Sequence, residues 1–573
     1  MLIDAHTVER DARIEADICI VGTGPAGLTL IKELAAEPVR VCAIESGGRD
    51  LEPNAQALNQ GTTISPDGYP SHLLAAARRR QLGGTANLWD DELNAGEGDE
   101  LVRLVPLDAI DFEKRDWIPH SGWPFDKSHL NSFYDRALRL AGAGSFAYDV
   151  ATWKSNHSEL PIPGVRLGTV MSQFGSRTIF TRDLPNGAAT AANVSVYLNA
   201  TVLEVVVNDG RGQHARIAAS PDREFQIAAK VFVLAAGGIE NARLLLLSNS
   251  GQPGGLGNQH DLVGRFFMDH PTFRLGLLCP ADQNLLRSAG LYDHHVVKGI
   301  PVMGKLIFRE EVMRREQMLN ICATITPRGR SYESRAVKII KRAAKLQSVA
   351  AAKLLTTEFR SIAAGSLELL LHGYERLTNQ KPRYFENKGG WSRSQNLERD
   401  HRKFEFSCLS EQSPDPENRV SLSDDVDPLG QRKAQLHWRW NDLDLRSISR
   451  AQEILKEELE RGGLGKFETQ RYLDWEQRPM VASPHHLLGT TRMHVNPQEG
   501  VVDANCRIHG IQNVYVAGSS VFPTGGFANP TLTIVALALR LAYHLKELMR
   551  SPSSPISSST NGASTASEPG ICG

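Results

Sequence analysis

The sequence predicts an α/β fold, α+β overall, in which a Rossmann-like domain is built from discontinuous segments of the chain. Residues 17–45 have the pattern of strand, glycine-rich turn, helix and strand, which is a βαβ unit. Apolar runs at 230–238 and 513–520 have the form of two further parallel strands. Because these three pieces are scattered along the sequence, we expect a second domain to be inserted between them, with an antiparallel sheet and helices.

The order of these segments predicts how the chain is divided. The first domain takes residues 1–271, with segments of the inserted domain near 100–190; residues 272–480 are mainly the inserted domain, 481–550 return to the first domain, and 551–573 are a disordered tail rich in Ser, Pro and Gly. Two β-rich stretches, near 194–230 and between about 270 and 325, are counted with the inserted material.

Composition excludes several classes of protein. The 573 residues include 64 Lys and Arg against 65 Asp and Glu, which argues against a basic nucleic-acid binder and fits a small neutral substrate better than a polyanion. The seven cysteines are widely spaced and form no CxxC pair, so we expect neither a disulfide framework nor a metal site. No secretory signal or membrane-spanning run is recognisable, and we expect a cytoplasmic protein.

A basic amphipathic helix is predicted over residues 334–356. Its cationic residues are Arg335, Lys338, Lys341, Arg342 and Lys345, and apolar residues lie opposite them. Such a helix can make peripheral contact with a membrane, or it can be a surface helix with a solvated basic face.

The turn of the first βαβ unit carries a dinucleotide-binding fingerprint. Gly22, Gly24 and Gly27 form G-x-G-x-x-G between the predicted strand and helix, where glycines allow a tight turn and close approach of a pyrophosphate. The helix N-terminus then presents N–H groups to the phosphates. Glu45 ends the next strand, where a carboxylate accepts hydrogen bonds from the ribose hydroxyls.

Four blocks resemble the glucose–methanol–choline (GMC) flavoprotein family. They are RRRQLGGTANLW at 78–89, AAGGIENARLLLLS at 235–248, GNQHDLVGRFFMDHP at 257–271 and the region from HHLLGTTRM at 485 to FANPTLTIVALALRLAYHL at 545. The resemblance covers about residues 14–271 and 482–548. The sequence of the last block is more similar to the pyranose oxidases and sugar dehydrogenases of the family than to its glucose oxidases. It implies FAD as the cofactor.

The fingerprint and the resemblance together imply the residues beside FAD. They are Gly22, Gly24, Pro25, Ala26, Gly27, Glu45, Ser46, Gly83, Gly84, Asn87, Leu88, Trp89, Val202, Ala236, Gly237, Gly518, Ser519, Pro530 and Thr531. The segment Gly500–Asp503 also resembles a flavin contact, whereas Ala517 stands where many members have Asp. Some pyranose oxidases carry, in place of Leu88, a histidine bonded covalently to the flavin; leucine cannot make that bond, so we expect non-covalent FAD.

The resemblance also implies two catalytic residues. His486 is the histidine of an H-x-x-G-T pattern, where the family places its base, and His485 is expected to pack or hydrogen-bond behind it. Asn529 occupies the position of the second catalytic residue and would orient the substrate oxygen. Asn529 followed by Pro530 also has the form of a helix N-cap with proline at the first helical position. His270 recurs in the family pattern, and a structural role is at least as compatible with it.

These residues imply FAD-dependent oxidation of an alcohol group, on a sugar or glycoside, by a GMC-type oxidase or dehydrogenase. A hydride passes to flavin N5, His486 takes the hydroxyl proton, and oxygen or a quinone or protein acceptor re-oxidises the flavin. Two alternatives stay open: a lyase on the same fold without net redox turnover, and a flavin-binding protein without catalysis.

Overall fold

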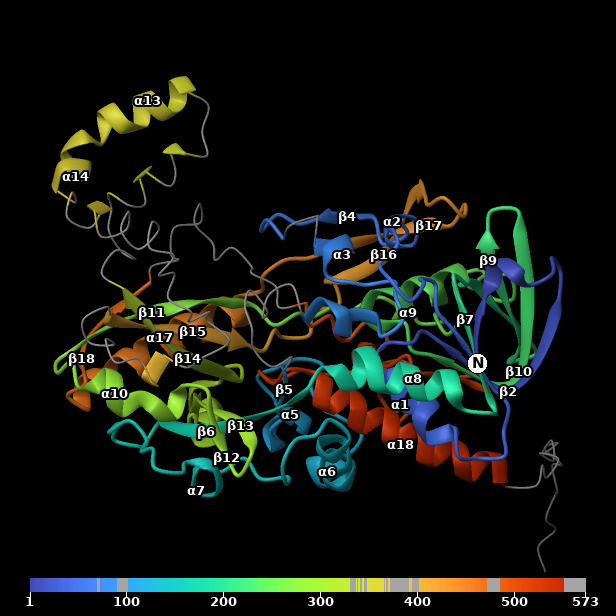
Figure 1. The fold of residues 1–573 in the computed structure, drawn as a ribbon, viewed down its shortest axis with the longest axis horizontal. Helices are drawn as coiled ribbons and strands as arrows, with labels where there is room; N and C mark the ends of the chain where they lie inside the picture. The colour runs from blue at the N-terminus through green and yellow to red at the C-terminus, as the bar shows by residue number, and fades with distance from the viewer. Residues whose placement is uncertain are drawn as a thin grey trace, which may run out of the picture.

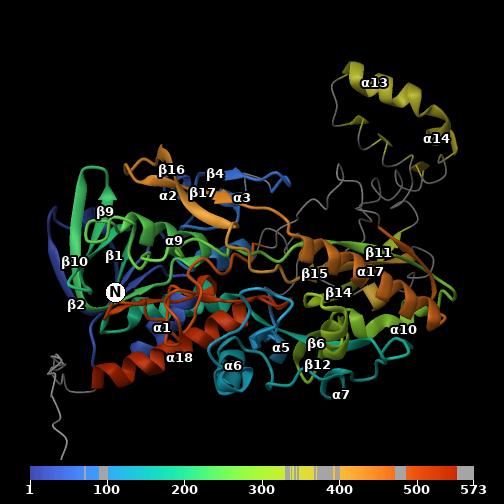
Figure 2. The ribbon, with the colours of Figure 1, turned by 180° about the vertical axis from the view of Figure 1, so that it is seen from behind.

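The computed structural model describes residues 1–69, 73–89, 101–329, 336, 339–340, 343–344, 348–364, 366, 369–370, 391–393, 401–470 and 485–550. Two large sheets lie toward opposite ends of the long axis (Figure 1). Viewed from either side, the first sheet region combines N-terminal blue, central green and C-terminal red segments (Figures 1 and 2). The first domain is therefore assembled from distant parts of the sequence.

The first sheet has eight strands in the order β1-β7-β3-β2-β10-β9-β8, with β19 beside β10. Their bounds are β1 (Leu2–Asp4), β2 (Arg13–Val21), β3 (Val41–Ile44), β7 (Val194–Leu198), β8 (Thr201–Asn208), β9 (Arg211–Ser220), β10 (Arg223–Leu234) and β19 (Val514–Val516). The pairs β1–β7, β7–β3, β3–β2, β2–β10 and β10–β19 are parallel. The pairs β10–β9 and β9–β8 are antiparallel. The prediction that the three scattered strands share one sheet is confirmed.

The assignment of residues 194–230 to the inserted material is wrong. These residues form β7, β8, β9 and most of β10, and β10 is the strand between β2 and β9 in the first sheet. Apolar alternation predicts that a segment is a strand, but not which sheet it joins, because that depends on pairing with residues far away in the sequence.

Helices cover this sheet and position its loops. Helix α1 (Pro25–Leu34) packs against α18 (Thr531–Arg550), with α8 (Leu184–Thr190) and α6 (Asn131–Leu140) beside them, and α9 (Gly237–Leu247) contacts β8 and β16. Figure 1 shows α1, α8 and α18 together on one side and α9 on the other. Because α1 and α18 both begin at the cavity described below, their N-termini lie on the same side of the sheet.

The second sheet is antiparallel, as expected for the inserted domain. Its order is β18-β11-β15-β14-β13-β6-β5, with β12 beside β13. The bounds are β5 (Leu101–Leu104), β6 (Leu167–Ser176), β11 (Thr272–Pro280), β12 (His295–Val297), β13 (Ile300–Phe308), β14 (Ile321–Gly329), β15 (His401–Ser410) and β18 (Gly465–Thr469). Helix α17 (Asp442–Arg461) packs on β11 and β18.

Smaller elements complete the described chain. A third sheet has the order β16 (Arg419–Val426), β17 (Arg432–His437) and β4 (Gly61–Ile64). Short helices are α2 (Pro53–Ala57), α3 (Leu73–Ala76), α5 (Ala109–Phe112), α7 (Val150–Trp153), α10 (Leu285–Ser288) and α11 (Glu310–Glu316).

Helix α13 (Ser348–Thr357) overlaps the C-terminal part of the helix predicted over residues 334–356, and α14 (Phe359–Ala364) follows it. The five basic residues of the predicted amphipathic helix, and the tail at 551–573, lie outside the described residues, so the expectations about them stay predictions. Among the described residues, no helix has both the length and the apolar character that crossing a membrane requires.

Candidate active site

A cavity of about 850 Å³ extends from the first sheet to the second. Its wall includes the ends of β2 and β3, the glycine turns after β2 and β10, and residues of β5, β13, β14 and β15. One end therefore has the residues of the dinucleotide fingerprint, and the other is built by the antiparallel sheet.

Two of the three fingerprint glycines, Gly22 and Gly27, leave no room for a side chain. Gly22 has φ +101°, and a Cβ there would lie 2.6 Å from the carbonyl oxygen of Ala235. A Cβ on Gly27 would lie 2.0 Å from the carbonyl oxygen of Gly22. At Gly24 a Cβ would meet nothing closer than 4.0 Å, so its backbone is open to the cavity at the start of α1, which no side chain caps. This surface fits a pyrophosphate, because glycine backbone and free helix N–H groups bind phosphate.

Glu45 lies where the ribose of such a dinucleotide is expected. Its Oε2 accepts hydrogen bonds from the N–H and hydroxyl of Thr23 at 3.1 and 2.7 Å, and its Oε1 accepts one from the N–H of Gly47 at 3.0 Å. Burial raises the pKa of this carboxyl. Since Oε1 takes one donor and has a second acceptor site, Glu45 can also accept from a ribose hydroxyl.

Most of the residues predicted to contact the cofactor line this cavity. They are Gly22, Gly24, Pro25, Ala26, Glu45, Ser46, Gly84, Leu88, Trp89, Val202, Ala236, Gly237, Gly518, Ser519, Pro530 and Thr531. Gly27, Gly83 and Asn87 lie outside its wall, and the amide of Asn87 instead donates to the carbonyls of Leu82 and Gly84 within its own turn. The segment Gly500–Asp503, which resembles a flavin contact of the family, also lies outside the cavity wall. The side chain of Asp503 instead accepts two backbone hydrogen bonds within a turn.

The arginines at this end are neutralised by carboxylates. Arg78 and Arg80 both pair with Glu240, at 2.5 and 2.7 Å, and Arg243 pairs with Asp427 at 2.7 Å. Burial opposes ionisation of Glu240, but the surrounding arginines hold its pKa far below its usual range. All five of these residues line the cavity, so the cofactor end combines cations and anions.

His486 is held in place by the segment that carries His270. Met268 and Leu488 form an antiparallel bridge, and the Oδ1 of Asp269 accepts hydrogen bonds from the backbone N–H of both His270 and His486, at 2.7 and 3.1 Å. The two imidazoles meet edge to face, and their Nδ1 atoms lie 2.8 Å apart. His270 therefore contacts His486 from behind, and His485, expected in that role, has φ +66° and lines the cavity.

The glycine of the H-x-x-G-T pattern has a steric role. Gly489 has φ +84°, and a Cβ there would lie 2.2 Å from the carbonyl oxygen of Phe266. The hydroxyl of Thr490 donates to the carbonyl of Gly238. These contacts fix the loop that carries His486 against the first domain.

Asn529 completes the cluster, and it is not a helix cap. Its Nδ2 lies 3.2 Å from Nε2 of His486, and its buried Oδ1 has no hydrogen-bond partner among the described residues. Helix α18 begins at Thr531, and the carbonyl of Pro530 accepts from the N–H of Ile534, so the prediction of Asn529 as N-cap and Pro530 as first helical residue is wrong by one position. The side chain of Asn529 is thereby free to face His486.

Electrostatics favour the neutral form of both histidines. Burial, and then electrostatic interaction with His270, His485, Lys305 and Arg103, lower the pKa of His486 well below its usual value. Burial also lowers the pKa of His270, which is 1% exposed. A neutral imidazole has one bare nitrogen that can accept a proton.

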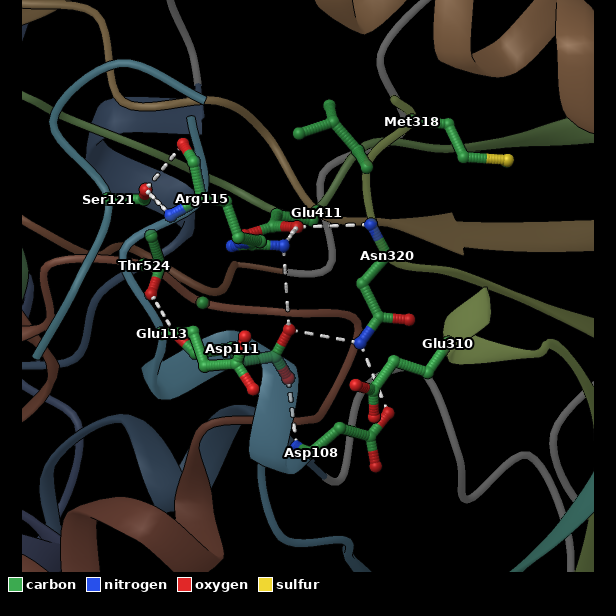
Figure 3. A network of polar contacts seen from close by, with 12 residues as sticks. Asp108, Asp111, Glu113, Arg115, Ser121, Glu310, Met318, Asn320, Glu411 and Thr524 are labelled. Carbon is green, nitrogen blue, oxygen red and sulfur yellow. Dashed lines mark hydrogen bonds and ion pairs between the residues drawn. The ribbon is translucent and has the colours of Figure 1, made fainter. Parts of the chain in front are cut away.

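A buried network supports the loop that leads to Asn529 (Figure 3). Arg115 donates to both oxygens of Glu411, at 2.9 and 2.5 Å. Burial, and then the charge of Glu411, raise the pKa of Asp111. A Cβ on Gly526 would lie 2.1 Å from Oδ2 of Asp111, so the network leaves room only for glycine there.

Several residues of the cavity were not predicted from the sequence. They come from the second sheet and its connections: Arg103, Phe174, Thr272, His294, Lys305, Thr324, Cys408 and Leu409. Each lies on a strand or loop without a local motif, so composition and spacing offered no signal for them.

Comparisons with known proteins agree with this arrangement. Residues 414–538 match the C-terminal model of the family described as GMC oxidoreductase. The chain is 26% identical over 325 residues to the fructose dehydrogenase large subunit of Gluconobacter japonicus, covering 56% of this chain and 48% of that protein. It is 38% identical over 136 residues to a C-glycoside 3-oxidase of Microbacterium trichothecenolyticum, covering 23% and 24%. The matched part thus spans about half or less of these two relatives.

One curated relative and one solved structure match over almost the whole chain. The 6'''-hydroxyparomomycin C oxidase of Streptomyces lividus is 22% identical over 601 residues, covering 92% of both chains. A variant of Aspergillus oryzae formate oxidase superposes with a TM-score of 0.51 at 16% identity, covering 94% of this chain and 99% of that one. The structural likeness confirms the predicted fold class.

Proposed function

We propose, from the premise that the chain belongs to the GMC oxidoreductase family, that it binds FAD and oxidises an alcohol group of a sugar or glycoside to the carbonyl. The single observation that carries the proposal is the contact of His486 with Asn529 in the wall of a cavity that also has the dinucleotide fingerprint. The names of the relatives, which include a fructose dehydrogenase and glycoside oxidases, support the substrate class.

When bound, FAD would supply an acceptor for the hydride at flavin N5. The fit rests on the glycine turn at Gly22 and Gly24 for the pyrophosphate and on Glu45 for the ribose. Leu88 lines the same cavity and has no group that could bond to the flavin, which supports non-covalent binding.

The hydrogen bonds around His270 specify which nitrogen of His486 is bare. The Nε2 of His270 lies 3.3 Å from the carbonyl oxygen of Gly525, which can only accept, so this nitrogen carries a hydrogen. Neutral His270 then has a bare Nδ1, which accepts the hydrogen on Nδ1 of His486 at 2.8 Å. We infer that Nε2 of His486, beside Asn529, is the bare nitrogen and acts as the base.

The proposed reaction assigns one task to each side chain. A substrate hydroxyl between His486 and Asn529 gives its proton to Nε2 and accepts a hydrogen bond from Nδ2 of Asn529. The carbinol C–H bond would break with its electron pair as the C=O bond forms, and that hydride would pass to bound FAD, so that the two-electron oxidation of the alcohol balances. Asp269 contributes by holding the backbones of both histidines.

Anaerobic mixing of the FAD-loaded protein with a panel of sugars and glycosides tests the proposal. A substrate is expected to bleach the visible flavin absorbance, whereas a lyase or a non-catalytic flavin protein leaves it in place. His486→Ala is expected to slow bleaching by about 10²- to 10⁴-fold, as for loss of a positioned base. Exposed His260 provides the matched control, and His260→Ala is expected to keep the parent rate. Re-oxidation by air compared with a quinone then identifies the acceptor.

A further inference from the structure

We propose that the substrate of this site carries an anionic group, such as a carboxylate or phosphate on the sugar, and that Lys305 and Arg103 bind it. The inference rests on the proposed function, since it concerns the substrate of the same site. It departs from the expectation of a small neutral substrate that the near-zero net charge suggested.

Strand pairing brings the two cations to one face of the second sheet. Arg103 on β5 lies opposite Phe174 on β6. Lys305 on β13 lies opposite Val170, which is also on β6. Residues directly opposite each other share a face, and residues two or four apart on a strand do too. Arg103 and Lys305 therefore lie on the same face, and both line the cavity.

The groups that contact these cations among the described residues include no carboxylate. The Nζ of Lys305 lies 3.7 Å from the Sγ of Cys322 and 5.9 Å from the ring centre of Phe527. An Nη of Arg103 donates to the thioether of Met303 at 3.7 Å, its Cζ lies 5.2 Å from the ring centre of Phe174, and its Nε has no partner. No carboxylate of the described residues lies within ion-pair distance of either cation.

The contrast with the cofactor end of the same cavity strengthens the inference. At the cofactor end, Arg78, Arg80 and Arg243 each pair with a carboxylate. The acidic residues of the described wall, Glu45, Glu240 and Asp427, all lie at that end and not beside Lys305 and Arg103. Lys305 is 1% exposed, and removing an unpaired cation from water is costly. Burial accordingly lowers the pKa of Lys305 to about 8. An anion bound between the two cations would offset that cost.

The two cations are electrostatically coupled to the proposed base. Both Lys305 and Arg103 contribute to the lowered pKa of His486. An anionic group of the substrate would reduce their effect, so the base becomes stronger only when the substrate is in place.

Matched pairs of sugars test the inference. The FAD-loaded protein is mixed anaerobically with glucose and galactose, with the corresponding uronates, and with their 6-phosphates, and both flavin bleaching and calorimetric binding are measured. We expect at least one anionic form to bind about tenfold or more tightly than its neutral partner, with that preference falling as salt rises. The uronate and phosphate arms show which anion is preferred.

Variants assign the preference to the two cations. Lys305→Met and Arg103→Met are each expected to bring the anionic-to-neutral ratio close to one, whereas Arg103→Lys keeps most of it. Lys466→Met, at an exposed lysine on β18 of the same sheet, is the control and is expected to keep the parent ratio. FAD content measured for every variant reports on folding.

The outcomes separate this inference from the proposed function. If neutral sugars bleach the flavin and anionic ones bind and react no better, the proposed function stands and the anion site is refuted. If no sugar bleaches the flavin, the proposed function fails, and calorimetry still decides: tighter uronate or phosphate binding that Lys305→Met abolishes supports the site, and equal binding or none refutes it.

Discussion

The Nδ1 atoms of His270 and His486 lie 2.8 Å apart, and the other ring nitrogen of His270 faces a backbone carbonyl. In the proposed mechanism this pair makes His270 a positioning residue, because its bare nitrogen would keep the hydrogen of His486 on Nδ1 and leave Nε2 free toward the cavity.

Replacing His270 tests that role. His270→Leu removes the acceptor, so we expect kcat to fall about 10- to 100-fold, as is usual when the partner that orients a functional histidine is lost. His270→Gln, whose carbonyl can accept from Nδ1, is expected to recover part of that loss. Flavin reduction at saturating substrate gives kcat, and FAD content reports on folding. An unchanged kcat in His270→Leu would show that the contact only packs.

The lowered pKa of His486 predicts how activity depends on pH. Its neutral form is the proposed base, so activity should be lost as pH falls through the pKa and should be full above it. Burial, and then electrostatic interaction with His270, His485, Lys305 and Arg103, place that pKa well below the ordinary value of about 6.5. We expect kcat/KM for a neutral sugar to stay level from neutral pH to below pH 6. A base with an ordinary pKa would give half-maximal activity near pH 6.5, contrary to this prediction.

Two helical glycines provide a matched test of the cofactor turn. A Cβ on Gly27 would lie 2.0 Å from the carbonyl oxygen of Gly22, whereas Gly187 in α8 has open space around it, and neither residue has positive φ. We expect Gly27→Ala to lower both thermal stability and FAD content. Gly187→Ala should leave FAD content unchanged and stabilise the fold by up to about 1 kcal/mol, the helix preference of alanine over glycine. Thermal unfolding and flavin absorbance measure both quantities, and retention of full FAD content in Gly27→Ala would contradict the assignment.

Leucine at position 88 predicts that the flavin is released when the protein unfolds. Acid precipitation of the yellow protein, followed by absorbance of the supernatant, is expected to recover all the flavin as free FAD. Flavin that stays in the protein pellet would mean that another residue of the wall forms a covalent bond.

The parts of the site that could be predicted depend on local geometry. Gly22 and Gly27 were identifiable because a tight turn between strand and helix excludes side chains within a few residues of sequence. His486 and Asn529 were proposed from the resemblance to sequence motifs of the family. In the structure, Nε2 of His486 lies 3.2 Å from Nδ2 of Asn529. Local sequence patterns alone could not predict that His486 and Asn529 are in contact, because 43 residues separate them.

Arg103 and Lys305 show why the rest could not be predicted. Their placement on one face depends on the register of β5, β6 and β13. More than 190 residues of sequence separate β5 from β13. The same limit explains the misassigned strands at 194–230, whose alternation was visible but whose partners were not. Unpaired buried charge becomes informative only when the neighbours of each cation are known.

The position of β19 beside β10 has a consequence for biosynthesis. Chains begin to fold from the N-terminus while the ribosome is still translating, but the last parallel strand of the first sheet is Val514–Val516 and the wall ends with Asn529, Pro530, Thr531 and Ile534. The nascent protein therefore cannot enclose its flavin until residues 514–534 have left the ribosome, and cofactor loading is coupled to the folding of that segment.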